Sequence, residues 1–199
     1  MKKFLGILVL GLLLSSNAYA NDINDFKMEG MSIGDSLLDY FSKKDIEDNS
    51  VFMFEKKKYK TFVVVSKSHP RSDYFFSTNL EIYDQLAINY LYKDNDYKIS
   101  SLDGSIYFKD NIKNCYKEKD KTTSELTELF GESATIKDEG FTKKKNFKYN
   151  AVNFIFDEGS SARVTCRDYK KKIKNKIDQL GVILKSIEYR KWFNEEAYK

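Results

Sequence analysis

The sequence predicts an α+β fold, with a mostly antiparallel sheet packed by a long central helix and a C-terminal helix. Short β-branched or alternating segments follow one another with turn residues between them, which is typical of hairpins. Residues 110–131 instead carry apolar side chains at helical spacing. The order of elements lacks the regular strand–helix alternation of a parallel sheet, so we expect the helices on one face of an antiparallel sheet.

The segment after residue 20 is expected to begin with a short strand and then a short helix. Phe26 and Met28 alternate with polar residues and indicate a strand that Gly30 stops. Residues 36–42 have apolar side chains at helical spacing. We expect Asp35 to cap this helix, with three side chains facing the core: Leu37, Leu38 and Phe41. A second helical turn should follow Ser42, which begins a sequence of capping-box form.

The strands are predicted from β-branched runs and from alternation of apolar and polar residues. Asp103 and Gly104 interrupt one of them and are expected to form a bulge or a tight turn. Residues 132–147 are polar and are expected to form a surface loop. The expected strand segments are 61–65, 73–77, 86–92, 97–108, 151–156, 162–166 and 182–184.

The long helix is predicted over 110–131, with Asp110 as its N-cap and Gly131 just past its end. Its inner stripe steps by three or four residues: Ile112, Cys115, Lys119, Thr122, Leu126 and Leu129. Ser186 is expected to cap a C-terminal helix that holds three large aromatic residues: Tyr189, Trp192 and Phe193.

Residues 1–20 have the pattern of a secretory signal peptide, with cleavage expected after Ala20. Lys2 and Lys3 precede an apolar run that is too short for a transmembrane helix, and 18–20 is a small-x-small site. An uncleaved anchor is the alternative. Cleavage would leave 21–199 as a single globular domain in the periplasm or outside the cell. Its net charge would fall from +4 to +2, which is too small to indicate a nucleic-acid binder.

Cys115 and Cys166 are the two cysteines of the chain. An even pair in an exported protein predicts a disulfide, which here would tie the long helix to the strand at 162–166. Two cysteines without nearby histidine are too few for a structural zinc site, and a redox pair is more often Cys-x-x-Cys.

Residues 34–37, Gly-Asp-Ser-Leu, match the four letters that name the GDSL hydrolases. A serine nucleophile needs a base within hydrogen-bond reach. The only histidine, His69, lies 33 residues after Ser36 and lacks the Asp-x-x-His pattern of those enzymes. The Gly-x-Asn-Asp block and a buried strand before Gly34 are also missing. We therefore interpret Ser36 as part of a helix start.

The other candidate sites have simpler interpretations. His69 precedes Pro70 and is expected in a loop, and Asp94 to Asp96 are expected in a hairpin turn. A calcium loop would require glycine where Ile99 stands. Three lysine clusters could touch anionic lipid or an acidic partner, although solvated surface is the simpler interpretation: 56–60, 143–145 and 170–176. We assign no catalytic residue, cofactor or metal ligand.

Four stretches of the sequence resemble a group of small exported proteins from AT-rich marine alphaproteobacteria. These are Gly30 with Ile33 to Leu38, Tyr97-Lys98-Ile99, Ile112-x-x-Cys115, and Cys166. The resemblance implies export and a shared fold, and it implies no site. The sequence favours a soluble, non-enzymatic domain that binds a protein or an envelope component; the partner itself is unknown. The alternative is a carboxylate-based hydrolase of glycan or peptidoglycan.

Overall fold

A computed structural model describes residues 22–109, 111–170 and 176–199 of the chain. The expected signal peptide therefore lies outside the described residues, as does the expected N-cap Asp110. In the described residues, nine strands form one sheet in the order β1-β2-β4-β5-β9-β8-β7-β6, with β3 added beside β2. Every pairing is antiparallel except β2 with β3. The fold is α+β, as predicted.

Four of the predicted strands are longer than the sequence pattern indicated, because pairing extends them beyond their apolar centres: β2, β7, β8 and β9. Strands β3 and β5 are shorter than predicted. The bounds of the strands are β1 Ser50–Val51, β2 Tyr59–Ser66, β3 Phe76–Thr78, β4 Gln85–Leu91, β5 Ile99–Tyr107, β6 Ala134–Lys143, β7 Phe147–Phe156, β8 Ser161–Tyr169 and β9 Gln179–Lys185. Three α-helices are described: α1 Lys43–Asp48, α2 Ile112–Phe130 and α3 Ile187–Glu195. Short 3-10 helices occupy Ile23–Asp25, Leu37–Asp39 and Gly131–Ser133.

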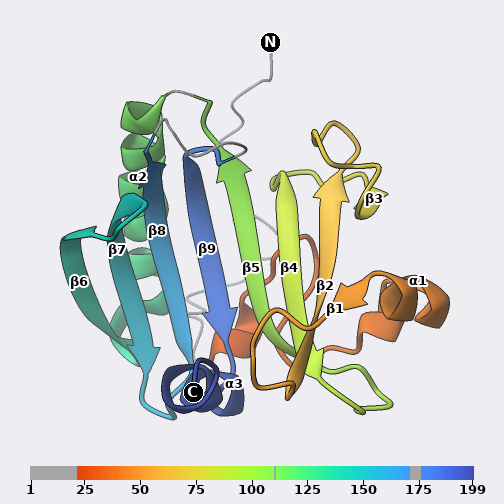
Figure 1. Cartoon of the computed structure of the whole chain (residues 1–199). Coiled ribbons are helices and arrows are strands. Elements are labelled where there is room, and N and C mark those ends of the chain that lie inside the picture. Colours follow the sequence, from red (N-terminus) through yellow and green to blue (C-terminus); the bar gives the residue numbers. More distant parts are fainter. Residues whose placement is uncertain (1–21, 110, 171–175) are drawn as a thin grey trace.

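The main core lies between one face of the sheet and a layer made of α2 and the N-terminal segment (Figure 1). Helix α2 contributes its inner stripe, with buried Cys115, Lys119, Thr122, Leu126 and Phe130. The Phe130 ring packs edge-on against the rings of Phe154 and Phe156 on β7. The prediction of a long amphipathic helix is thus confirmed, except that Asn111 is its N-cap: the Asn111 side chain accepts a hydrogen bond from the Asn114 amide.

A disulfide joins Cys115 on α2 to Cys166 on β8, with 6.0 Å between the Cα atoms. Both residues are fully buried. The bond therefore fixes the long helix to the centre of the sheet from within the core, as the sequence predicted.

Helix α3 packs on the opposite side of the sheet from α2, at the lower end in Figure 1. There Trp192 and Tyr189 contact Tyr59 of β2, with ring centroids 4.7 and 4.9 Å from the Tyr59 ring. Ser186 caps α3 by accepting a hydrogen bond from the Tyr189 amide. The expectation that the helices share one face is therefore wrong, because the aromatic face of α3 forms a second, smaller core.

The polar segment 132–147 is a strand rather than a loop. Strand β6 pairs only with β7 and forms an edge of the sheet, so most of its side chains are exposed and show no apolar alternation. Gly140, with φ of +59°, lies beside a bulge in this strand. Bulges and charged residues on edge strands discourage pairing with other chains.

Two further expectations for the N-terminal half are wrong. Phe26 and Met28 are buried as expected, but Met28 begins a tight turn closed by a Met28–Met31 bridge, and no strand forms here. Strand β5 runs without interruption through Asp103 and Gly104. Gly104 is required there because a Cβ would lie 2.5 Å from both Met28 and Tyr83 side-chain atoms.

Candidate functional site

The face of the sheet opposite α2 carries mainly polar side chains over its central strands, and we call it the polar face. Strand registers decide which residues share it. Asp103 on β5 lies beside Ile183 on β9, which lies beside Arg163 on β8 and then Asn153 on β7. The neighbouring row contains the small side chains Ser105, Gly181, Thr165 and Ala151. Figure 1 views this face, with α3 across its lower end.

Five ionisable residues of the polar face form what we call the charged cluster: Asp103, Glu139, Arg163, Arg167 and Lys185. They come from four strands, β5, β6, β8 and β9. The alternation of Arg163 and Arg167 with the buried residues Ala162, Val164 and Cys166 places both arginines on the polar face.

Arg163 is held by Glu139 in a two-point interaction. Its two terminal nitrogens lie 2.8 and 2.9 Å from the two carboxylate oxygens. Asn153 joins the pair, because it accepts a hydrogen bond from Arg163 and donates one to Glu139. The Arg163 guanidinium also lies 5.4 Å from the centre of the Tyr149 ring. The hydrogen bonds from Arg163 lower the pKa of Glu139, so this carboxylate stays ionised.

Asp103 and Lys185 are held in a poorly solvated part of the cluster. Oδ1 of Asp103 is out of contact with solvent and has no hydrogen-bond partner in the described residues. Burial raises the pKa of Asp103, while the positive charges of Arg167 and Lys185 act in the opposite direction. Burial lowers the pKa of Lys185 to about 8, and the neighbouring Asp103 charge opposes that shift.

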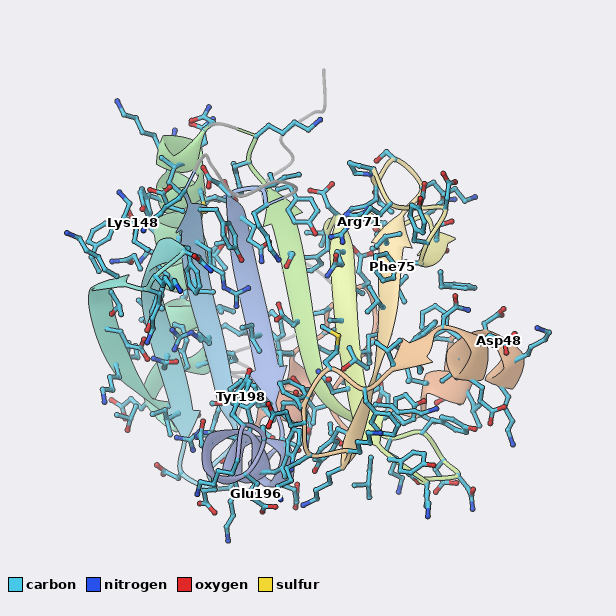
Figure 2. The ribbon with its side chains drawn as sticks, viewed as in Figure 1. Asp48, Arg71, Phe75, Lys148, Glu196 and Tyr198 are labelled. Carbon is cyan, nitrogen blue, oxygen red and sulfur yellow. A yellow bond between two sulfur atoms is a disulfide. The ribbon has the colours of Figure 1, made fainter. Side chains whose placement is uncertain are left out.

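The C-terminal helix supplies much of this desolvation. The Nζ atom of Lys185 lies 3.6 Å from the centre of the Phe193 ring on α3. Trp192 is buried, and its indole nitrogen has no hydrogen-bond partner in the described residues. The exposed Tyr198 lies beyond α3, against the rings of Phe54 and Phe193 (Figure 2).

The charged cluster contains more basic than acidic side chains. Glu139 forms an ion pair with Arg163, whereas neither Arg167 nor Lys185 forms an ion pair within 4.0 Å with a described residue. The cluster can therefore accept a further negative charge, because an anion would compensate cations that are partly removed from water.

The structure gives Ser36 and His69 separate hydrogen-bond partners. The Ser36 hydroxyl donates to the Asp96 carbonyl at 2.6 Å and accepts from the Leu38 amide. Ser36, not Asp35, is therefore the cap of the 3-10 helix Leu37–Asp39. His69 lies in a loop, as predicted, and its Nδ1 accepts a hydrogen bond from the Arg71 amide. Burial lowers the pKa of His69.

Asp35 and Leu38 also differ from expectation. Asp35 accepts hydrogen bonds from the Ser32 amide and the Tyr40 hydroxyl instead of capping the helix. Leu38 is 42% exposed, because the 3-10 helix turns only its first residue, Leu37, fully into the core. The turn at Asp94 to Asp96 is confirmed: the Asp94 carboxylate accepts from the amides of Asp96 and Lys98.

Sequence reasoning did not identify any member of the charged cluster as a site residue. The signal for the arginines was their alternation with Ala162, Val164 and Cys166. The sequence has no comparable signal for Asp103, where it predicts a bulge or a tight turn. Among the residues described, no group of three or more His, Cys, Asp or Glu side chains is placed to hold a metal ion.

Comparison of the chain with protein-family models, with curated proteins and with solved structures gives no match. Over the part of the chain that the structure describes, no helix is long and apolar enough to cross a membrane.

Proposed function

We propose that the protein is a non-enzymatic binding domain of the periplasm or the secreted space, and that its polar face binds an anionic group of a protein or envelope component. The observation that supports this most directly is the pair of cations without ion-pair partners, Arg167 and Lys185, beside the desolvated Asp103.

The chemistry of the two cations suits such a ligand. A guanidinium presents parallel N–H donors that match a carboxylate or a phosphate, and an ammonium adds a compact charge. Arg163 is already engaged by Glu139 at both terminal nitrogens, so it acts as a support. Arg167 and Lys185 remain as the side chains that would contact the anion.

Location outside the cytoplasm is supported by two independent features. Residues 1–20 have the signal-peptide pattern, and the buried disulfide is of the kind that persists in oxidising compartments. N-terminal sequencing of the exported protein tests cleavage after Ala20 and should find Asn21 as the first residue. Retention of Met1 or Lys2 would contradict it.

A carboxylate-based hydrolase needs two carboxyl groups about 5–10 Å apart across the scissile bond. Asp103 and Glu139 do not meet this requirement. Strands β9, β8 and β7 lie between their strands, which corresponds to about 19 Å at the usual strand spacing. Glu139 is also bound by Arg163 through both oxygens, so binding is the function that the geometry of the cluster favours.

Chemical crosslinking in the native cell envelope tests the binding function. The wild-type protein is compared with Arg167→Ala and with Lys117→Ala, a matched loss of one exposed cation on α2. A partner that is captured by the wild type and the control, but lost with Arg167→Ala, is the expected result. Absence of any reproducible partner, or equal capture by all three proteins, would contradict the proposal.

A further inference from the structure

Two lysine clusters that are distant in the sequence meet at one end of the molecule. The turn between β6 and β7 carries the first cluster, and β8 ends beside it (Figure 1). Lys170 joins the two: its amide donates to the Asn146 carbonyl at 3.2 Å and its Nζ donates to the Lys145 carbonyl at 2.5 Å. We call this surface the lysine end, defined by Lys143, Lys144, Lys145, Lys148, Lys170 and Lys176.

Four residues of the lysine end, together with Asp168, line a pocket of about 410 Å³: Lys143, Lys144, Lys148 and Lys170. Aromatic rings contribute to its wall, with the Phe147 and Tyr169 ring centroids 5.4 Å apart. Lys176 lies over the Tyr169 ring at 5.9 Å. The Lys176 contact places its ammonium group over an aromatic ring, while the side chain stays exposed to solvent.

The charge of this end is strongly unbalanced. Lys148 forms an ion pair with Asp168 at 3.0 Å, and Asp178 accepts a hydrogen bond from the Tyr169 amide nearby. The remaining lysines of the lysine end form no ion pair with a described carboxylate. Figure 2 shows Lys148 at the upper rim of the sheet, at the end away from α3.

An exposed aromatic residue lies next to the lysines. Phe141 on β6 is 67% exposed, although its ring contacts Tyr116 of α2 with the centroids 5.4 Å apart. It precedes Lys143 by two residues on the same edge strand. A large apolar side chain beside several cations is the combination that peripheral proteins use at membrane interfaces.

From these observations we infer that the lysine end docks on a bilayer surface rich in anionic phospholipid, with the lysines at the headgroups and Phe141 at the acyl boundary. The pocket adjoins the polar face, because Phe147 and Tyr169 lie two residues along their strands from Tyr149 and Arg167. The lysines and Phe141 are not members of the charged cluster, so this inference does not depend on the proposed function. A bilayer is favoured over an acidic protein because the exposed lysines are spread over the β6–β7 turn and the segments that follow β8 and precede β9. A flat and laterally mobile array of charges can meet all of them.

A vesicle-binding experiment with the protein purified from the exported fraction tests the inference. Sedimentation is compared between vesicles of pure phosphatidylcholine and vesicles that also contain phosphatidylglycerol. Each lysine near such a surface contributes about fivefold to the partition coefficient. We therefore expect the partition coefficient of Lys143→Glu/Lys144→Glu to fall by at least about twenty-fivefold. Phe141→Ser, as a separate variant, should also bind more weakly than the wild type. Lys56→Glu/Lys57→Glu, in the exposed cluster before β2, is the matched control and should bind as the wild type does.

Several outcomes would overturn the inference. These are equal binding to both kinds of vesicle, no binding to phosphatidylglycerol vesicles, and equal losses in the two double variants. Release by inorganic phosphate beyond that by sodium chloride at equal ionic strength would instead indicate a small-anion site. Binding to polyglutamate that Lys143→Glu/Lys144→Glu abolishes, without binding to vesicles, would assign the surface to an acidic protein. Melting temperatures of the variants verify that each one is folded.

Discussion

Asp103 lies between cations on the polar face, with one carboxylate oxygen that neither solvent nor a described residue satisfies. Its negative charge partly compensates Arg167 and Lys185, as the opposing effects on the pKa of Asp103 indicate. If the cluster binds anions, Asp103 must oppose them by repulsion. The two signs of charge in the cluster therefore have opposite roles in binding.

Replacing Asp103 and Arg167 should consequently change anion affinity in opposite directions. We expect Asp103→Asn to raise the affinity for polyglutamate, and Arg167→Ala to lower it, each by about three- to tenfold from the loss of one nearby charge. Titration calorimetry at constant ionic strength measures both. Lys117→Ala on α2 is the control for a change in net charge. A loss of affinity in both cluster variants would mean that the site does not act through its charge.

Lys185 makes the stability of the protein depend on alkaline pH. Its pKa is about 8 in the folded chain and close to 10.5 when unfolded. Between these values the unfolded chain binds more protons, so the contribution of Lys185 to stability rises with pH. The cost of burying its charge is present in full below about pH 8 and disappears as the pH approaches 10.5.

Urea unfolding of the wild type and Lys185→Met between pH 7 and pH 10.5 tests this directly. From pH 7 to pH 10.5, the unfolding free energy of the wild type should rise by about 1–3 kcal/mol relative to that of Lys185→Met. Lys117→Met removes an exposed lysine, so its unfolding free energy should differ from that of the wild type by the same amount at every pH in this range. If the unfolding free energy of Lys185→Met also differs from that of the wild type by a constant amount, the Lys185 ammonium group is solvated in the folded protein.

At the scale of elements, a helix or strand could be predicted from the sequence where one of its faces is buried and the other is exposed. Helix α2 was evident because its inner stripe steps by three and four, even though that stripe includes the polar residues Lys119 and Thr122. Strand β6 was missed because an edge strand with few buried side chains leaves no alternation. The turn at Met28–Met31 was missed because Phe26 and Met28 alternate with polar residues, and this pattern also fits a short strand.

The same limits apply to the candidate site. The disulfide, which lies in the core on the other face of the sheet, could be predicted from two cysteines and a signal sequence alone. The charged cluster could not, because it depends on which strands become neighbours. Glu139 and Arg163 are 24 residues apart and belong to strands separated by β7. Only the full strand order brings Asp103 into line with Arg163 of β8.

The 3-10 helix that begins after Ser36 gives a test of the structural role of this serine. Ser36 caps the helix and also donates to the Asp96 carbonyl, so it attaches the N-terminal segment to the turn between β4 and β5. Ser42 caps α1 with a bond to the nearby Asp45 amide. We expect Ser36→Ala to lower the unfolding free energy by about 2 kcal/mol, and Ser42→Ala by about 1 kcal/mol. Urea melts measure both, and a smaller loss for Ser36→Ala would show that the Asp96 contact adds nothing.

At the scale of the whole molecule, the disulfide controls how the helix layer is attached to the sheet. Helix α2 packs mainly on β8 and β9, and Cys115 lies in its first turn, far along the chain from Cys166. Closing a loop of 51 residues stabilises a folded chain by about 4 kcal/mol in the chain-entropy description. That is a large part of the roughly 5–15 kcal/mol by which a domain of this size is stable.

Cys115→Ala/Cys166→Ala should therefore lose about 4 kcal/mol of unfolding free energy, measured by urea unfolding without reductant. Reductant should destabilise the wild type toward the variant and leave the variant itself unchanged. Because the bond holds α2, amide exchange in α2 should quicken more than exchange in β2 and β4, which lie on the other half of the sheet. Uniform acceleration of both regions would mean that the disulfide acts only through the unfolded chain. A loss below about 1 kcal/mol would mean that the core holds α2 without it.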